Sequence, residues 1–152
     1  DIDKMLSIYR DMEQRKGIMR QYSKTELQNL FERLKKYIIF YGCKDEAGEL
    51  IGFRGCAVVG SKGWDLLAAT SSKGRKVYAS YALFSALLRQ CMSLGVRYYD
   101  MGGVDNVLNK GVYDFKKGTG AKTIEYLGEW DWATSRLVAK IANWAIKRKF
   151  RF

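Results

Sequence analysis

Apolar residues at the start of the chain repeat with the period of a helix, and they predict two helices before any strand. Residues 2–16 carry an apolar repeat of three to four positions, which Gly17 ends. Ser23 stands three residues before Glu26, which is the pattern of a capping box. A second helix is therefore expected over about 24–36.

Runs of apolar, aromatic and β-branched residues follow, and they predict strands. The runs 37–43 and 50–60 flank a polar turn, as the strands of a hairpin do, and 64–70 is expected to be a third strand. A helix is expected over 77–94 because its leucines share one face. The run 96–101 is the next expected strand, and a glycine pair ends it.

The last third of the chain predicts a short helix over 105–115, an alternating strand over 122–130 and a basic amphipathic helix over 135–149. With 152 residues, the chain is expected to form one domain, 1–152. The order of the expected elements resembles that of the GCN5-related N-acetyltransferase (GNAT) fold: a hairpin and a third strand come first, and a basic turn and a long helix follow. The expected fold class is therefore α/β (α+β), with a mixed central sheet flanked by helices.

The composition excludes several classes of chemistry. The chain has no histidine, which excludes Ser-His-Asp and Cys-His mechanisms within it and removes the commonest metal ligand. Its three cysteines lack CxxC spacing, so we expect no disulfide framework and no metal site, and we expect a cytoplasmic protein. No apolar run approaches the ~20 residues that span a bilayer.

The positive charge is large and unevenly distributed. The net charge is +11, and residues 73–122 carry 9 basic and 3 acidic side chains. Residues 133–152 carry 6 basic side chains and no acidic one. Such asymmetry favours a polyanionic partner, which would be a nucleic acid, a phosphate-rich cofactor or an anionic membrane surface. A merely solubilising surface is the alternative.

The stretch "SSKGRKVYA", 71–79, is expected to be a basic turn at the start of the long helix. Its cations can cradle a phosphate together with the amides of the helix N-terminus, and a solvated loop is the alternative. The candidate binding residues here are Lys73, Arg75, Lys76, Tyr78 and Tyr81.

The same stretch departs from the acetyl-CoA signature of the GNAT fold, Q/R-x-x-G-x-G/A. Arg75 is followed at those offsets by Tyr78 and Ser80, where the signature has small residues. A tyrosine obstructs the close backbone approach that glycine permits. Coenzyme A is therefore disfavoured as the donor.

The stretch "VRYYDMGGV", 96–104, ends a strand where α/β folds place ligands. Alternation sends Tyr98 and Asp100 to one face of the sheet and Tyr99 to the other. One of the tyrosines can stack on a substrate or donate to it. Packing is the alternative for at least one of them.

Three separated pieces of the chain carry a resemblance to a known family. They are "YYDMGGV" at 98–104, "GVYDFKKGTG" at 111–120 and "YLGEWDW" at 126–132. In this order they resemble the FemABX-type aminoacyltransferases, whose pieces read YD-x-x-G-[IV], G-[LV]-Y-x-F-K and Y-x-G-E-[FW]-D. The basic helix that follows extends the resemblance toward residue 149.

The resemblance implies an activity. FemABX enzymes transfer an aminoacyl group from aminoacyl-tRNA to an amine of a peptidoglycan precursor, and they use two domains of this fold and no cofactor beyond the donor. The chain resembles the second, C-terminal, domain. The family's Phe-Lys pair lies beside the reacting ester and corresponds to Phe115 and Lys116. Thr119 departs from the family, which often has a large aromatic residue there, so the acyl group cannot be inferred.

The implied chemistry gives each residue of "FKKG" a role. Lys116 would stabilise the oxyanion that forms when an amine attacks the ester. One oxyanion-hole donor lowers the activation free energy by ~3 kcal/mol. Phe115 would form a wall of the acyl pocket, Lys117 would contact phosphate, and Gly118 would admit the terminal adenosine. Without the resemblance, solvated lysines and a turn glycine are the simpler interpretation. Asp100 is a candidate base, although the substrate's carboxylate or the ribose hydroxyl can also serve.

The basic stripe of the last helix has three interpretations: it follows a tRNA backbone, lies on an anionic membrane, or belongs to a helix that simply packs. Two other functions also stay open. One is an acyl-CoA-dependent N-acyltransferase on the same fold. The other is a non-catalytic module that binds tRNA or a membrane.

Overall fold

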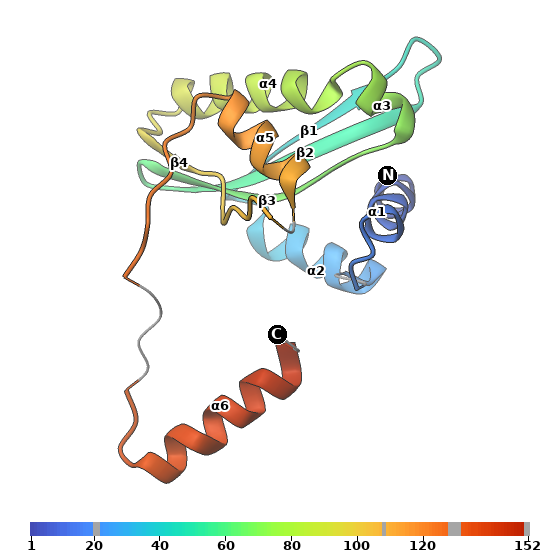
Figure 1. Cartoon of the computed structure of the whole chain (residues 1–152). Helices are drawn as coiled ribbons and strands as arrows, with labels where there is room; N and C mark the ends of the chain where they lie inside the picture. The colour runs from blue at the N-terminus through green and yellow to red at the C-terminus, as the bar shows by residue number, and fades with distance from the viewer. Residues whose placement is uncertain (20–21, 108, 128–131, 151–152) are drawn as a thin grey trace.

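The computed structural model describes residues 1–19, 22–107, 109–127 and 132–150, and Figure 1 shows the arrangement of its elements. The first two elements are helices, α1 (Ile2–Lys16) and α2 (Lys24–Leu34). Ser23 accepts a hydrogen bond from the backbone N–H of Glu26, and the Glu26 side chain accepts one from the backbone N–H of Ser23. The predicted capping box is confirmed.

Four strands form one mixed sheet in the order β1-β2-β3-β4. They are β1 (Ile38–Lys44), β2 (Leu50–Val59), β3 (Lys62–Thr70) and β4 (Tyr98–Asp100). The first three are antiparallel neighbours, and β4 runs parallel to β3. The expected mixed sheet flanked by helices is confirmed.

Helices cover both faces of the sheet (Figure 1). On one face α1 and α2 pack on β2 and β3, where Tyr9 stacks on Phe53 with ring centroids 6.3 Å apart. On the other face lies α4 (Ala79–Ser93), whose Leu87 and Cys91 pack with Cys56 of β2 in a second buried cluster. Successive residues of β2 therefore serve two cores, as the alternation of side chains along a strand requires.

A β-bulge changes this alternation on β3. Gly55 pairs with Leu67, whereas Cys56 pairs with Asp65, so Leu66 is the extra residue. Leu66 and Leu67 both pack into the α1 core. Asp65 consequently turns to the α4 face, where it meets Arg54. Bulges often redirect a side chain in this way beside functional sites.

Two predicted helices have different bounds in the structure. Residues 72–93 form α3 (Ser72–Lys76) and α4 instead of a turn and one helix over 77–94, because Tyr78 takes a left-handed conformation with φ 55°. The helix expected over 105–115 is α5 (Lys110–Gly118). The N–H of Val107 bonds the side chain of Asp105, a local turn that competes with a helix there.

Helix α5 extends beyond the predicted end at residue 115. Lys116, Lys117 and Gly118 lie in its last turn and not in a loop. Gly120 supplies the left-handed conformation, φ 79°, that commonly follows a helix end.

The strand expected over 122–130 is absent from 122–127, and residues 128–130 lie outside the described part. The pattern alternates, but Ile124, Tyr126 and Leu127 are all exposed, so this segment has no sheet face to bury. Its side chains instead form one wall of a pocket.

The final helix is α6 (Arg136–Phe150), close to the predicted bounds, and it lies apart from the sheet in Figure 1. Apolar side chains on it are exposed, among them Leu137, Ile141 and Trp144, so they do not join either core. Among the described residues, no helix is both long and apolar enough to cross a membrane.

Candidate functional site

A pocket of about 1000 Å³ opens between the end of β4, helix α5 and the segment 121–126. The glycine pair after β4 lines it together with basic and tyrosine side chains. The lining residues are Lys62, Arg97, Tyr98, Tyr99, Asp100, Met101, Gly102, Gly103, Val104, Tyr113, Lys116, Lys117, Ala121, Lys122, Thr123, Ile124 and Tyr126.

Lys116 reaches into this pocket from the last turn of α5. Its Nζ donates to the carbonyl oxygen of Gly103 at 2.7 Å and to that of Gly102 at 3.2 Å. Burial lowers the pKa of Lys116 from its ordinary value; Asp65 opposes the shift and Arg54 adds to it. An ammonium group has three N–H donors, so these two bonds leave one for a bound group.

Asp100, at the end of β4, is committed to two neighbours. Its Oδ1 accepts from the backbone N–H of Gly102 at 2.9 Å, and its Oδ2 lies 3.5 Å from Nζ of Lys62. This geometry holds the turn that carries the two carbonyl oxygens bound by Lys116.

The two tyrosines of β4 have different environments. Tyr98 is exposed, whereas Tyr99 packs against the α4 core and donates from its hydroxyl to Oδ1 of Asp65 at 2.8 Å. Burial, and then Asp65, raises the pKa of Tyr99. Tyr99 therefore has the packing role expected for one of them, and Tyr98 is the tyrosine that a ligand can reach.

The ring of Phe115 points away from the pocket. It packs on Tyr81 and Phe84 with ring centroids 4.9 and 5.9 Å away, and the guanidinium carbon of Arg54 lies 5.1 Å from its centroid. Phe115 does not line the pocket, so its role as a wall of an acyl site stays a prediction. Gly118 lies beside Tyr81, whose hydroxyl would be 3.3 Å from a Cβ at that glycine.

The pocket concentrates positive charge. Five cations line it, namely Lys62, Arg97, Lys116, Lys117 and Lys122, against one acid, Asp100. Tyrosine rings stand among them, which can stack on a base while the cations neutralise phosphate. Three of these cations were missed by sequence reasoning because only the parallel β3–β4 pairing and the path of 121–126 bring them to α5.

The basic turn at 71–76 does not contribute to this pocket. Lys73 forms an ion pair with Asp45 at 2.5 Å, and Arg75 donates to the carbonyl of Thr70 and the hydroxyl of Ser72. Lys76 is exposed. Tyr78, 71% exposed, begins the aromatic row that leads through Tyr81 to Phe115.

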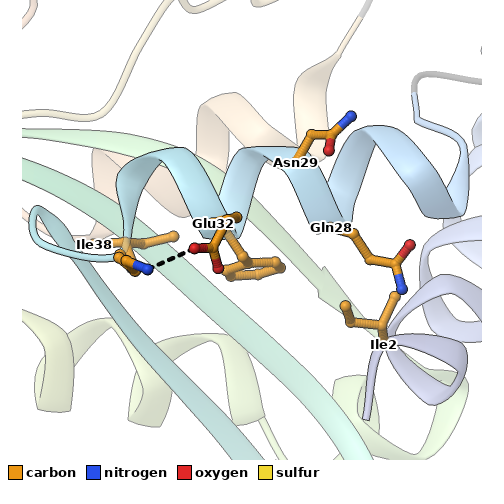
Figure 2. Close-up of a pocket in the computed structure, with 7 residues that line it drawn as sticks. Ile2, Gln28, Asn29, Glu32 and Ile38 are labelled. Carbon is orange, nitrogen blue, oxygen red and sulfur yellow. Dashed lines mark hydrogen bonds and ion pairs between the residues drawn. The ribbon is translucent and has the colours of Figure 1, made fainter.

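A second hollow, of about 650 Å³, lies beside α2 (Figure 2). Its only charged pair is Glu32 with Lys35, at 2.5 Å, and none of its residues belongs to the motif at 98–132. It offers no group suited to the predicted chemistry. Across the described part of the chain, no group of three potential metal-binding side chains comes together.

The chain matches a sequence-family model. The model of the FemAB family matches residues 58–147, which include β3, β4, α4, α5 and the residues that line the pocket. No curated protein sequence matches the chain.

Solved structures share its fold at low identity. An acetyltransferase of the GNAT family from Staphylococcus aureus has a TM-score of 0.69 at 10% identity, over 86% of this chain and 88% of that one. A predicted acetyltransferase from Clostridium acetobutylicum, solved with acetyl-CoA, has a TM-score of 0.66 at 16% identity, over 86% and 90%. An aminoglycoside acetyltransferase from an uncultured soil metagenomic sample, solved with sisomicin, has a TM-score of 0.64 at 13% identity, over 89% and 91%. The chain therefore has the GNAT fold.

Proposed function

Because the chain belongs to the FemAB family and has the GNAT fold, we propose that it is an N-acyltransferase domain whose acyl donor is aminoacyl-tRNA. The acceptor is an amine of a peptidoglycan precursor peptide. One observation carries the proposal. Lys116, which corresponds to the lysine of the family's Phe-Lys pair, lines a cationic pocket with its ammonium group.

The proposed role of Lys116 is to stabilise developing negative charge. An amine that attacks the ester carbon of aminoacyl-tRNA forms a tetrahedral intermediate with a negatively charged oxygen. Lys116 is already oriented by the carbonyl oxygens of Gly102 and Gly103, so it needs little reorganisation to donate its remaining N–H. When the carbon–oxygen bond to the ribose breaks, the ribose oxygen takes up a proton and the new amide remains on the acceptor.

The surroundings of Lys116 fit the 3′ end of a tRNA. Five cations can neutralise the terminal phosphates, and the exposed ring of Tyr98 is available for a base to stack on. Lys117, whose Nζ lies 5.8 Å from the Tyr113 ring centroid, is the proposed phosphate contact. Because aminoacyl-tRNA is found in the cytoplasm, a donor of this kind also supports the expected cytoplasmic location.

Asp100 already has a partner for each of its carboxylate oxygens. One oxygen accepts from the Gly102 amide, and the other lies 3.5 Å from the Lys62 amine. The ribose hydroxyl or the substrate's own carboxylate therefore remains in the proposal as the group that removes the amine proton.

Binding to tRNA tests the proposal without knowledge of the acceptor. Filter binding would compare charged tRNA, uncharged tRNA and poly(dT), each at low and at physiological salt. The proposal expects charged tRNA to bind tightest, and it expects Lys116→Ala to bind charged tRNA as the wild type does, because Lys116 acts on the transition state. Equal binding of all three polyanions would favour a non-catalytic nucleic-acid module instead.

An acyl-CoA donor is the second candidate, and the fold supports it directly. The Clostridium acetobutylicum neighbour was solved with acetyl-CoA. Against it, Tyr78 is the N-cap of α4 in a left-handed conformation, so a large exposed side chain stands where the signature has glycine. Transfer of the acetyl group from labelled acetyl-CoA to a peptide amine, with no transfer from aminoacyl-tRNA, would establish this candidate.

A further inference from the structure

Arg54 is a buried arginine directly behind the candidate site. It is 4% exposed, its Nε donates to Oδ1 of Asp65 at 2.9 Å, and its Nη2 donates to Oδ2 at 2.6 Å. Asp65 faces Arg54 only because of the bulge at Leu66. Two parallel bonds to one carboxylate fix the plane of the guanidinium group as well as its position.

Two aromatic rings pack on this fixed group. The guanidinium carbon lies 4.8 Å from the ring centroid of Phe84 and 5.1 Å from that of Phe115. Tyr99 holds Asp65 from a third side through its hydroxyl. Strands β2, β3 and β4 therefore each supply one member of a network that ends on the Phe115 ring.

Helix α5 depends on this contact because no residue of the helix is buried. Phe115 is half-buried, and it packs α5 on α4 and the sheet by its contacts with Tyr81, Phe84 and Arg54. Lys116 is the next residue in the chain. A shift of the Phe115 ring would accordingly displace the Lys116 amine from the carbonyl oxygens of Gly102 and Gly103.

We propose that Arg54 is a positioning residue: together with Asp65 and Tyr99, it holds Phe115 and thereby places the amine of Lys116 in the pocket. A buried ion pair often adds little net stability over apolar residues of similar volume. Its value here is orientation of the helix that carries Lys116. For the transfer rate the inference rests on the proposed function, whereas the position of Lys116 can be measured without it.

Charged groups from four elements surround the Lys116 amine. Arg54 of β2, Asp65 of β3 and Asp100 of β4 act on it, and Lys16 of α1 is near enough for its own pKa to be lowered, first by burial, then by Arg15 and by Lys116. Arg54→Lys keeps the charge of this set unchanged. It removes only the forked bond and the flat face that packs between two rings.

Competitive acetylation of the full chain with acetic anhydride, followed by mass spectrometry of the lysine peptides, tests the proposal. Acetylation is followed across pH, which separates the fraction of deprotonated amine from the reactivity of that amine. In the wild type, the deprotonated amine of Lys116 should react more slowly than that of the exposed Lys110 of the same helix, because Lys116 is half-buried and bonded to two carbonyl oxygens. In Arg54→Lys its rate should approach that of Lys110. The matched control is Arg89→Lys, because Arg89 is exposed on α4 and bonds only Ser85 among the described residues.

The kinetic counterpart is a fall in kcat of about 100-fold for Arg54→Lys, with KM for aminoacyl-tRNA unchanged, as expected for a misplaced catalytic group. An unchanged acetylation rate at Lys116 in a folded Arg54→Lys protein would overturn the inference. If Arg54→Lys does not fold, Tyr99→Phe, which removes one bond to Asp65 and keeps the ring, is judged by the same acetylation readout. If Lys116 is displaced but the wild type transfers no aminoacyl group, the positioning role stands and the proposed function fails.

Discussion

The amine of Lys116 lies 2.7 Å from the carbonyl oxygen of Gly103. This hydrogen bond joins the last turn of α5 to the segment that follows β4. The two segments belong to separate pieces of the FemAB motif, 98–104 and 111–120. In this chain one piece supplies the cation and the other supplies the carbonyl oxygens that orient it. The proposed chemistry depends on this contact.

Replacement of Lys116 by alanine should lower kcat for aminoacyl transfer about 100- to 1000-fold, the usual cost of one oxyanion donor. The matched control is Lys110→Ala on the same helix, where the lysine is exposed and pairs with Asp114 at 2.7 Å. It should leave kcat within about twofold, since an exposed ion pair contributes little. Single-turnover transfer from labelled aminoacyl-tRNA measures both, and equal rates for the two variants would remove Lys116 from the mechanism.

The pH dependence of the rate should report the ionisation of Lys116. Burial lowers the pKa of this lysine, and only its protonated form can stabilise an oxyanion. The rate should therefore fall as pH rises through that pKa, and the fall should begin below the range of an ordinary lysine. In Lys116→Arg the alkaline fall should disappear because arginine stays protonated. Rates are corrected for the spontaneous hydrolysis of the ester. If the rate fell in the same way at high pH in the wild type and in Lys116→Arg, the fall would belong to a group other than Lys116.

Much of the fold could be predicted from local patterns, because each pattern acts within one element. Ser23 and Glu26 predicted the start of α2, and the apolar runs predicted β1 to β3. The break at Tyr78 could not be predicted because a left-handed tyrosine has no local signal. The strand at 122–127 failed because alternation indicates a strand only where a sheet edge is there to pair with it.

The candidate site was predictable only in part. The Phe-Lys pair and the strand end were found from the family's motif, and the structure places Lys116 and Asp100 on one pocket. Arg54 and Asp65 had no signal, since a bulge in β3 decides that they face each other. The cations of 71–76 were favoured by their charge and by their place at a helix start, yet Lys73 and Arg75 are bound to neighbours outside the pocket.

Breaking the buried ion pair should destabilise the domain. Asp65→Ala leaves the guanidinium of Arg54, whose side chain is 5% exposed, without its carboxylate, which should cost about 3–5 kcal/mol in the free energy of unfolding. Asp3→Ala removes an exposed pair with Lys24 and should cost less than about 1 kcal/mol. Urea denaturation compares the two, and a similar small loss for both would show that Asp65 does not hold Arg54.

Two glycine substitutions should have opposite effects. A Cβ at Gly74 would lie 2.2 Å from the carbonyl oxygen of Ile51, a backbone atom that cannot move aside cheaply. Gly74→Ala should therefore lower the free energy of unfolding by about 1–3 kcal/mol, as overpacking does. At Gly111, in α5, a Cβ meets nothing within 4 Å, and Gly111→Ala should raise stability by up to about 1 kcal/mol. Thermal unfolding measures both, and a neutral Gly74→Ala would contradict the tight packing of α3 on β2.

The most direct test of the central claim is single-turnover decay of labelled aminoacyl-tRNA in the presence of a peptidoglycan precursor peptide. The wild-type chain should convert the ester to a new amide on the peptide, and Lys116→Ala should bind the same tRNA yet lose nearly all of this conversion. Amide formation at the same rate in Lys116→Ala, or formation only when acetyl-CoA replaces the charged tRNA, would contradict it.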